Sequence, residues 1–135
     1  MVYVDTNVLI YAGIEQDLDK KKTAMKLLKK HALNDSLQLS LLTLQEYSFT
    51  FAKLKIDNTI IQQDIQYYSN HVEHLITIPM FLAATELCSK INFFKNINDV
   101  IHLKFAEQHC NKLITFDKDF KKLIPYTKLK IEILV

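Results

Sequence analysis

The chain has 135 residues, of which 17 are basic and 15 are acidic, so its formal net charge is +2 at pH 7. With 49% hydrophobic and 24% charged residues it can form a core, which excludes a disordered or fibrous protein, and its length suits a single domain over residues 1–135. Every basic residue is a lysine and Gly13 is the only glycine, so a glycine-rich phosphate-binding loop is excluded as well.

The sequence predicts neither export nor membrane insertion. Its first residues lack the basic start and apolar stretch of a signal peptide, and its apolar runs are far shorter than the ~20 residues that span a bilayer. Cys88 and Cys110 have no CxxC spacing and fit free thiols in a reducing compartment. We therefore expect a cytoplasmic protein without a membrane anchor.

The first half of the chain predicts two strands, each followed by a helix. An apolar strand at Val2–Val4 precedes a short helix that ends at Gly13, and Asp17–Leu33 has the spacing of an amphipathic helix with lysines on its outer face. Leu37–Leu41 predicts a second strand. The sequence Thr-Leu-Gln-Glu that ends at Glu46 has the form of a capping box, which would begin the next helix.

The second half continues the alternation of strands and helices. Asp57 is placed to cap a helix, Val72–Ile78 predicts a third strand, and Pro79 suits the first turn of the helix that follows. Lys112–Phe116 predicts a fourth strand, and the alternating residues of Leu129–Val135 predict a half-exposed edge strand. This order predicts an α/β fold, a three-layer α/β/α sandwich with an open, mainly parallel sheet.

Acidic residues stand at the exits of the predicted strands, where ligands bind in sheets of this kind. They are Asp5 after the first strand, Glu46 in the helix after the second, Asp117 and Asp119 after the fourth, and Asp99 at the start of the helix that leads to the fourth. Taken singly, each could be a helix cap or could complement a helix dipole. Taken together, carboxylates in one pocket raise one another's pKa unless a cation neutralises them.

The type of donor predicts which cation this would be. Oxygen ligands without clustered cysteine or histidine indicate Mg²⁺ or Mn²⁺ in preference to zinc. Two such ions can activate a water and stabilise the leaving oxygen when a phosphodiester is cut. The sequence therefore predicts phosphate chemistry that depends on a divalent cation.

These motifs, in this order and spacing, resemble the PIN-domain ribonucleases, and most closely the small VapC-type toxins of type II toxin–antitoxin systems. The resemblance is carried by VDTNVLIY from Val4, by Glu46, by NDVIH from Asn98, and by LITFDKDF from Leu113. It covers essentially the whole chain. It implies a PIN-like fold, a Mg²⁺- or Mn²⁺-dependent endoribonuclease that cuts RNA such as tRNA or rRNA, a homodimer, and a cognate antitoxin as partner.

The resemblance also implies roles for single residues. Asp5, Asp99 and Asp117 resemble the metal ligands, and Glu46 resembles the carboxylate that completes the catalytic site. Three further residues resemble polar neighbours of these acids: Asn7 and Thr115, which would orient the carboxylates, and Asp119, which would lie farther from the metal. The absence of arginine departs from the family, whose members commonly use it to contact RNA, and leaves the mode of RNA binding open.

Other functions remain open at this point. Asp5 could carry a covalent phosphoryl group, as in haloacid-dehalogenase-like phosphatases, although these usually need a second aspartate where this chain has Asn7. The chain could also be a PIN nuclease of RNA processing, or a catalytically silent module that binds RNA or protein. His102 could approach the acids or simply be a packed helix residue, and the lysines from Lys20 to Lys30 could bind RNA or form a solvated helix face.

Overall fold

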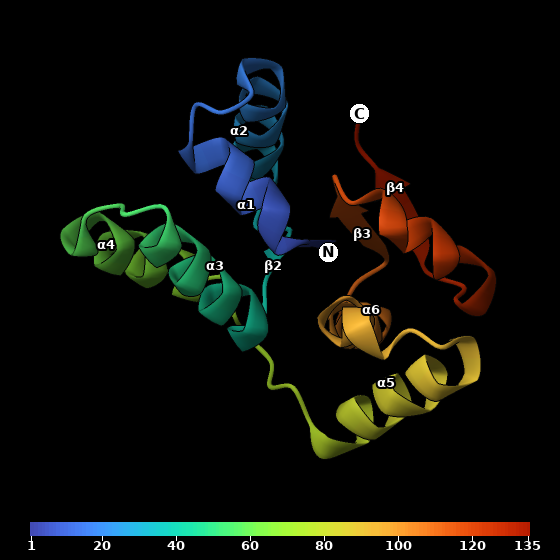
Figure 1. Cartoon of the computed structure of the whole chain (residues 1–135). Helices are drawn as coiled ribbons and strands as arrows, with labels where there is room; N and C mark the ends of the chain where they lie inside the picture. Colours follow the sequence, from blue (N-terminus) through green and yellow to red (C-terminus); the bar gives the residue numbers. More distant parts are fainter.

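A parallel β-sheet forms the centre of the structure, a computed structural model that describes residues 1–135 (Figure 1). Its four strands are β1 (Val2–Val4), β2 (Leu37–Gln38), β3 (Lys112–Thr115) and β4 (Lys130–Ile133). They lie in the order β2-β1-β3-β4 and every neighbouring pair is parallel. Their carboxyl ends therefore meet at one edge of the sheet, as predicted, and β4 is an edge strand.

Helices cover both faces of this sheet. The α-helices are α1 (Thr6–Gly13), α2 (Leu18–Leu33), α3 (Leu41–Lys53), α4 (Asn58–Ser69), α5 (Ile78–Ile91) and α6 (Ile97–His109). Three short 3-10 helices are η1 (Phe94–Asn96), η2 (Lys118–Lys122) and η3 (Ile124–Tyr126). Helices α1 to α4 pack on one face, and α5 and α6 on the other, which gives the three layers seen in Figure 1. No helix combines the length and the apolar character that crossing a membrane requires.

Alternate residues of the central strands belong to two separate cores. Val2 and Val4 of β1 pack with α1 and α2, whereas Tyr3 between them packs with α5 and α6. In β3, Ile114 faces the first core and Leu113 the second. Because successive side chains of a strand point to opposite faces, a strand that is covered on both sides reads as a continuous apolar run. This is why the sequence predicts β1 and β3 correctly.

Helix caps confirm several of the predicted boundaries. Asp17 accepts a hydrogen bond from the backbone N–H of Lys20 (3.1 Å), and Asp57 accepts one from Thr59 (2.7 Å). Pro79 lies in the first turn of α5, where its missing N–H costs no hydrogen bond.

The predicted start of α3 is wrong by three residues, because the predicted capping box has Thr43 as its cap. Ser40 is the N-cap: its Oγ accepts from the N–H of Thr43 (3.3 Å), and Thr43 Oγ1 accepts from the N–H of Ser40 (3.4 Å). This capping box shortens β2 to Leu37–Gln38 and places Glu46 in the second turn of the helix. Glu46 is therefore not a capping residue.

The third strand predicted at Val72–Ile78 is not formed. The segment carries the chain around the edge of the sheet, because Val72 packs against the core under α1 to α4 and Ile76 against the core under α5 and α6. Leu75 is 77% exposed, and Thr77 caps α5 by accepting from the N–H of Met80 (3.3 Å). A segment that crosses from one face to the other cannot also run parallel to the strands.

Candidate acidic active site

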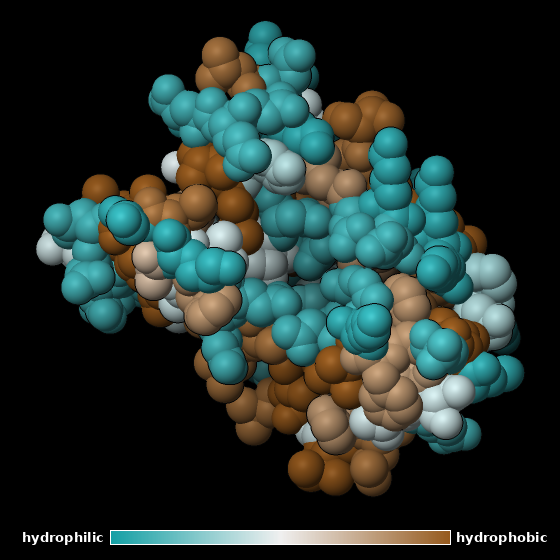
Figure 2. Space-filling model, viewed as in Figure 1, coloured by the Kyte–Doolittle hydropathy of each residue, from teal (hydrophilic) through white to brown (hydrophobic).

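Asp5 links the end of β1 to the start of α1. Its N–H donates to the carbonyl of Ile114 (2.9 Å), which continues the pairing of β1 with β3, and its Oδ1 accepts from the N–H of Thr6 (2.8 Å) as the helix cap. The residue is only 5% exposed. Figure 2 shows hydrophilic side chains gathered in the middle of this face, where α1, α3, α6 and the end of β3 come together.

The hydroxyl of Thr115 joins three of the predicted site residues. It donates to Oδ2 of Asp5 (2.7 Å), accepts from Nδ2 of Asn7 (3.2 Å), and accepts from the backbone N–H of Asp117 (2.9 Å). Asn7 is fixed in turn, because its Oδ1 accepts from the N–H of Phe116 (3.1 Å). Thr115 and Asn7 thus hold the carboxylate of Asp5 and the backbone of Asp117 in place.

Glu46 reaches the same place from α3 and is held by three donors. Its Oε1 accepts from Thr6 Oγ1 (2.6 Å) and from His102 Nε2 (2.6 Å), and its Oε2 accepts from Asn98 Nδ2 (3.1 Å). These donors come from α1 and α6, so Glu46 connects the three helices that surround the acids.

His102 is 1% exposed and uses both ring nitrogens. Nε2 contacts Glu46, and Nδ1 hydrogen-bonds to the hydroxyl of Tyr3. The Tyr3 hydroxyl also lies 2.8 Å from Ser40 Oγ and 3.0 Å from Thr43 Oγ1. The sequence leaves open whether His102 approaches the acids or is a packed helix residue. In the structure it does both.

The surroundings of His102 and Glu46 shift both pKa values toward a charged pair. Burial by itself lowers the pKa of His102, but the hydrogen bond to Glu46 and the charges of Asp5, Glu46 and Asp99 raise it overall. Burial by itself raises the pKa of Glu46, but the hydrogen bond and charge of His102 lower it overall. These two shifts favour an imidazolium beside a carboxylate, so the charge of Glu46 is already balanced within the protein.

The aspartates share only His102 as a cation. Its Nε2 lies 3.9 Å from Oδ1 of Asp5 and 2.6 Å from Oε1 of Glu46, so one positive charge faces two carboxylates. Burial still raises the pKa of Asp5, and burial together with the charges of Asp5 and Asp117 raises the pKa of Asp99 to about 7. No lysine lies within ion-pairing distance of Asp5, Asp99 or Asp117; the lysines that form ion pairs are Lys21, Lys104 and Lys112. The site therefore holds more acidic groups than His102 can balance.

This donor set fits a hard divalent cation. Asp5, Glu46 and His102 have ligand atoms within 4.8 Å of one another, but the hydrogen bonds of His102 leave neither ring nitrogen free to bind a metal. The donors that remain in this group are carboxylate oxygens of Asp5 and Glu46. Asp99 and Asp117 are not part of it, but the charges of Asp5 and Asp117 act on Asp99, so the three aspartates lie near one another. Oxygen donors of this kind suit Mg²⁺ or Mn²⁺.

Asp119 lies at the exposed rim of the cluster. Its backbone N–H donates to Oδ1 of Asp117 (2.8 Å), and its carboxylate shares the amide of Asn96 with Asp99, at 3.5 Å and 3.4 Å. The sequence alone does not indicate that Asn96 and Thr6 belong to the site, or that Asn98 donates a hydrogen bond to Glu46. In the sequence, these three residues are distinguished only by lying next to an acidic residue or within one helical turn of an acidic residue.

The acid cluster lies on an open face. The largest cavity, about 810 Å³, is lined elsewhere by residues of α5, α6 and the segment before β4. None of the five main cavities is lined by Asp5, Glu46, Asp99 or Asp117.

The fold and this site define an α/β protein with a carboxylate centre suited to divalent cations. The family model of the PIN domain matches residues 2–124, so the chain belongs to the PIN domain family. PIN domains are nuclease domains, and this membership favours the nuclease over the phosphatase reading of Asp5.

Two solved structures share the fold. VapBC2 from Rickettsia felis, bound to a DNA fragment from its promoter, is similar with a TM-score of 0.70 and 20% identity over 100% of both chains. A toxin–antitoxin complex from Klebsiella pneumoniae is similar with a TM-score of 0.64 and 23% identity, over 89% of this chain and 90% of that one. No curated protein of similar sequence is found.

Proposed function

We propose that the protein is a metal-dependent endoribonuclease that hydrolyses phosphodiester bonds of RNA. The observation that carries this proposal is the cluster of Asp5 and Asp117, which follow strands, with Asp99 in the first turn of α6. His102 is the one cation that pairs with this cluster, and the pKa of Asp99 rises to about 7. Membership of the PIN domain family supports it.

The residues of the chain divide into two groups. Asp5, Asp99 and Asp117 would hold Mg²⁺ or Mn²⁺, which when bound lowers the pKa of a water and offsets the charge of the phosphate. Glu46 is fixed by Thr6, Asn98 and His102, so it keeps its charge and its orientation. Without a cation, the pKa values of both Asp5 and Asp99 are raised, that of Asp99 to about 7.

The test of this proposal is the Asp5→Asn variant. We expect it to lose cleavage of bulk tRNA and rRNA in Mn²⁺ by more than the ~10–100-fold that removal of a merely orienting group costs. Calorimetric titration should also show no Mn²⁺ binding, while the circular dichroism spectrum stays unchanged. Asp35→Asn is the matched control, because Asp35 is exposed and has a φ of 54°, which asparagine tolerates. Undiminished cleavage by Asp5→Asn would refute the proposal.

The two structural neighbours suggest the biological role. Both come from complexes described as VapBC2 and as a toxin–antitoxin complex, so we infer that this chain is the toxin of such a pair, with an antitoxin as its protein partner. We further infer that it acts as a homodimer on tRNA or rRNA. Induced expression in a bacterial host should arrest growth, Asp5→Asn should not, and the product of the neighbouring reading frame should restore growth. Unimpaired growth alongside cleavage in vitro would instead assign the chain to RNA processing.

A further inference from the structure

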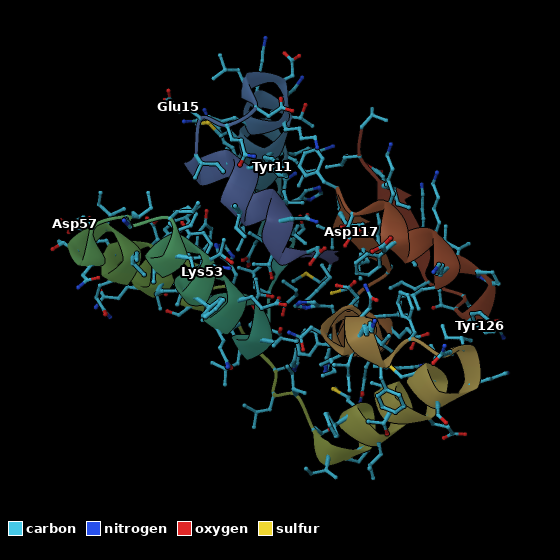
Figure 3. The ribbon with its side chains drawn as sticks, viewed as in Figure 1. Tyr11, Glu15, Lys53, Asp57, Asp117 and Tyr126 are labelled. Atoms are coloured by element: carbon cyan, nitrogen blue, oxygen red, sulfur yellow. The ribbon has the colours of Figure 1, made fainter.

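A lysine is held over two aromatic rings beside the acid cluster. Tyr11 lies one turn after Asn7 in α1, and Phe116 directly precedes Asp117. The two rings meet edge to face with centroids 5.2 Å apart. Nζ of Lys20, from the first turn of α2, lies 4.7 Å from the centroid of Tyr11 and 5.5 Å from that of Phe116. Figure 3 labels Tyr11 and Asp117, which border the same central region of this face.

Lys20 differs from the other lysines of its helix. It is partly buried and forms no ion pair, whereas Lys21 pairs with Glu15 at 3.4 Å. The remaining lysines of α2 are exposed; they are Lys22, Lys26, Lys29 and Lys30. A cation over ring faces is stabilised by about 0.5–1 kcal/mol and loses part of its rotamer freedom. Lys20 therefore presents an ordered ammonium whose charge no carboxylate neutralises.

A short chain of hydrogen bonds connects the backbone of Phe116 to the acids. The N–H of Phe116 donates to Asn7, Asn7 donates to Thr115, and Thr115 donates to Asp5. The backbone that carries one of the two rings is thus fixed relative to the carboxylate of Asp5. Lys20 nevertheless lies outside ion-pairing distance of Asp117, so it does not fill the cation site.

We propose that Lys20 is a substrate-binding residue whose ammonium contacts a backbone phosphate of the RNA next to the phosphate that is cut. The inference rests on the proposed function. The acids and their cation bind the scissile phosphate. The acids repel the flanking phosphates of the RNA unless a positively charged side chain lies beside those phosphates. The chain has no arginine, and Lys20 is the lysine of α2 that is both ordered and unpaired at this position.

Salt dependence tests this contact directly, because each phosphate that is neutralised releases counterions. For Lys20→Gln, the slope of log affinity against log salt for a labelled mixed-sequence single-stranded RNA, measured in Ca²⁺ to suppress cleavage, should fall by about 0.7. KM for bulk tRNA in Mn²⁺ should rise severalfold with kcat little changed. Lys20→Arg, which keeps the charge, should restore the slope, and Lys22→Gln on the same helix should behave as the wild type.

The outcomes separate this inference from the proposed function. Equal salt slopes for Lys20→Gln and Lys22→Gln in a protein that cleaves RNA would overturn the inference alone. A change in Mn²⁺ affinity without a change in the RNA salt slope would also overturn it, because Lys20 would then only balance the charge of the acids. If the wild-type protein cleaves no RNA and binds no Mn²⁺, the proposed function itself is refuted.

Discussion

Nε2 of His102 lies 2.6 Å from Oε1 of Glu46. His102 belongs to α6 on one face of the sheet, and Glu46 belongs to α3 on the other face. One charged hydrogen bond therefore joins the two layers directly beside the aspartates. Because the imidazolium already balances Glu46, the pair stabilises the framework of the site without supplying a counter-ion for Asp99 or Asp117.

Removing the imidazole should cost more than removing the charge of its partner. His102→Ala leaves Glu46 without its counter-ion and opens a space in the core, so we expect the free energy of unfolding to fall by about 3 kcal/mol. Glu46→Gln should cost less, since an amide oxygen still accepts from Thr6 and the histidine can lose its proton. Urea denaturation of both variants at pH 6 measures the difference. A larger loss in Glu46→Gln would contradict a balanced ion pair.

The same pair predicts how stability depends on pH in EDTA. The raised pKa of His102 gives stability that is complete below its ordinary value of 6.5 and is lost as the pH rises through the higher folded value. The lowered pKa of Glu46 gives stability that is complete above 4.5 and is lost as the pH falls through the lower folded value. The difference in unfolding free energy between wild type and Glu46→Gln should therefore be largest between pH 4.5 and pH 6.5. A difference independent of pH would argue against the charged form.

The pKa shift of Asp99 should destabilise the metal-free protein, whereas the shifts of His102 and Glu46 stabilise it. Its folded pKa of about 7 lies above the ordinary 3.8, so in metal-free protein its contribution to stability decreases as the pH rises between these values. Asp99→Asn should therefore raise the unfolding free energy at pH 8 in EDTA by at least about 1 kcal/mol.

Divalent cations should make the wild type more stable than Asp99→Asn, which reverses their order in EDTA. At 100 times its dissociation constant, Mn²⁺ stabilises the wild type by about 2.7 kcal/mol, whereas Asp99→Asn should gain much less. Thermal unfolding with and without Mn²⁺ gives both numbers. Equal stabilisation of the two proteins would remove Asp99 from the set of metal ligands.

The Thr115 hydroxyl should matter for metal binding although it is not a proposed ligand. Thr115→Val removes the donor to Asp5 and the acceptor for Asn7 and Asp117, and we expect Mn²⁺ affinity to fall by about 10–100-fold. Thr115→Ser keeps the hydroxyl and should bind nearly as well as the wild type. Calorimetric titration compares the two, and equal losses in both variants would point to packing of the methyl group instead.

The single glycine should resist replacement by alanine. A Cβ at Gly13 would lie 2.7 Å from Cζ of Phe51, which is 1% exposed and whose ring centroid is 4.2 Å from that of Tyr47. The resulting overpacking costs about 1–3 kcal/mol, which exceeds the ~0.5–1 kcal/mol that alanine gains in a helix. Gly13→Ala should therefore lower the urea midpoint, and adding Phe51→Leu should recover part of the loss. A higher midpoint for Gly13→Ala would show that the ring moves aside freely.

Local patterns predicted the elements that carry the aspartates. The apolar runs before Asp5 and Asp117 indicate strands buried on both faces, and parallel strands bring their carboxyl ends to one edge. The caps at Asp17 and Asp57 act within a few residues and could be predicted for the same reason.

Features that depend on distant contacts could not be predicted in this way. The hydrogen bond between Glu46 and His102 joins residues 56 positions apart, so no local pattern indicates that His102 is the counter-ion of Glu46. The Thr-Leu-Gln-Glu sequence fits a capping box, but Ser40 provides an earlier one that starts the helix first. The Val72–Ile78 segment has a strand-like composition because it must satisfy two cores, one on each side of the sheet.

Neither border of the sheet offers a long free strand. On one side β2 has two residues, and the N–H of Leu39 just beyond it already donates to the carbonyl of His71 in the crossing segment (2.9 Å). On the other side β4 places Lys130 and Glu132 on its outer strand, a pattern that discourages another chain from adding its own strand. Addition of a further strand is therefore disfavoured at both borders, which protects the sheet against edge-to-edge growth into larger aggregates.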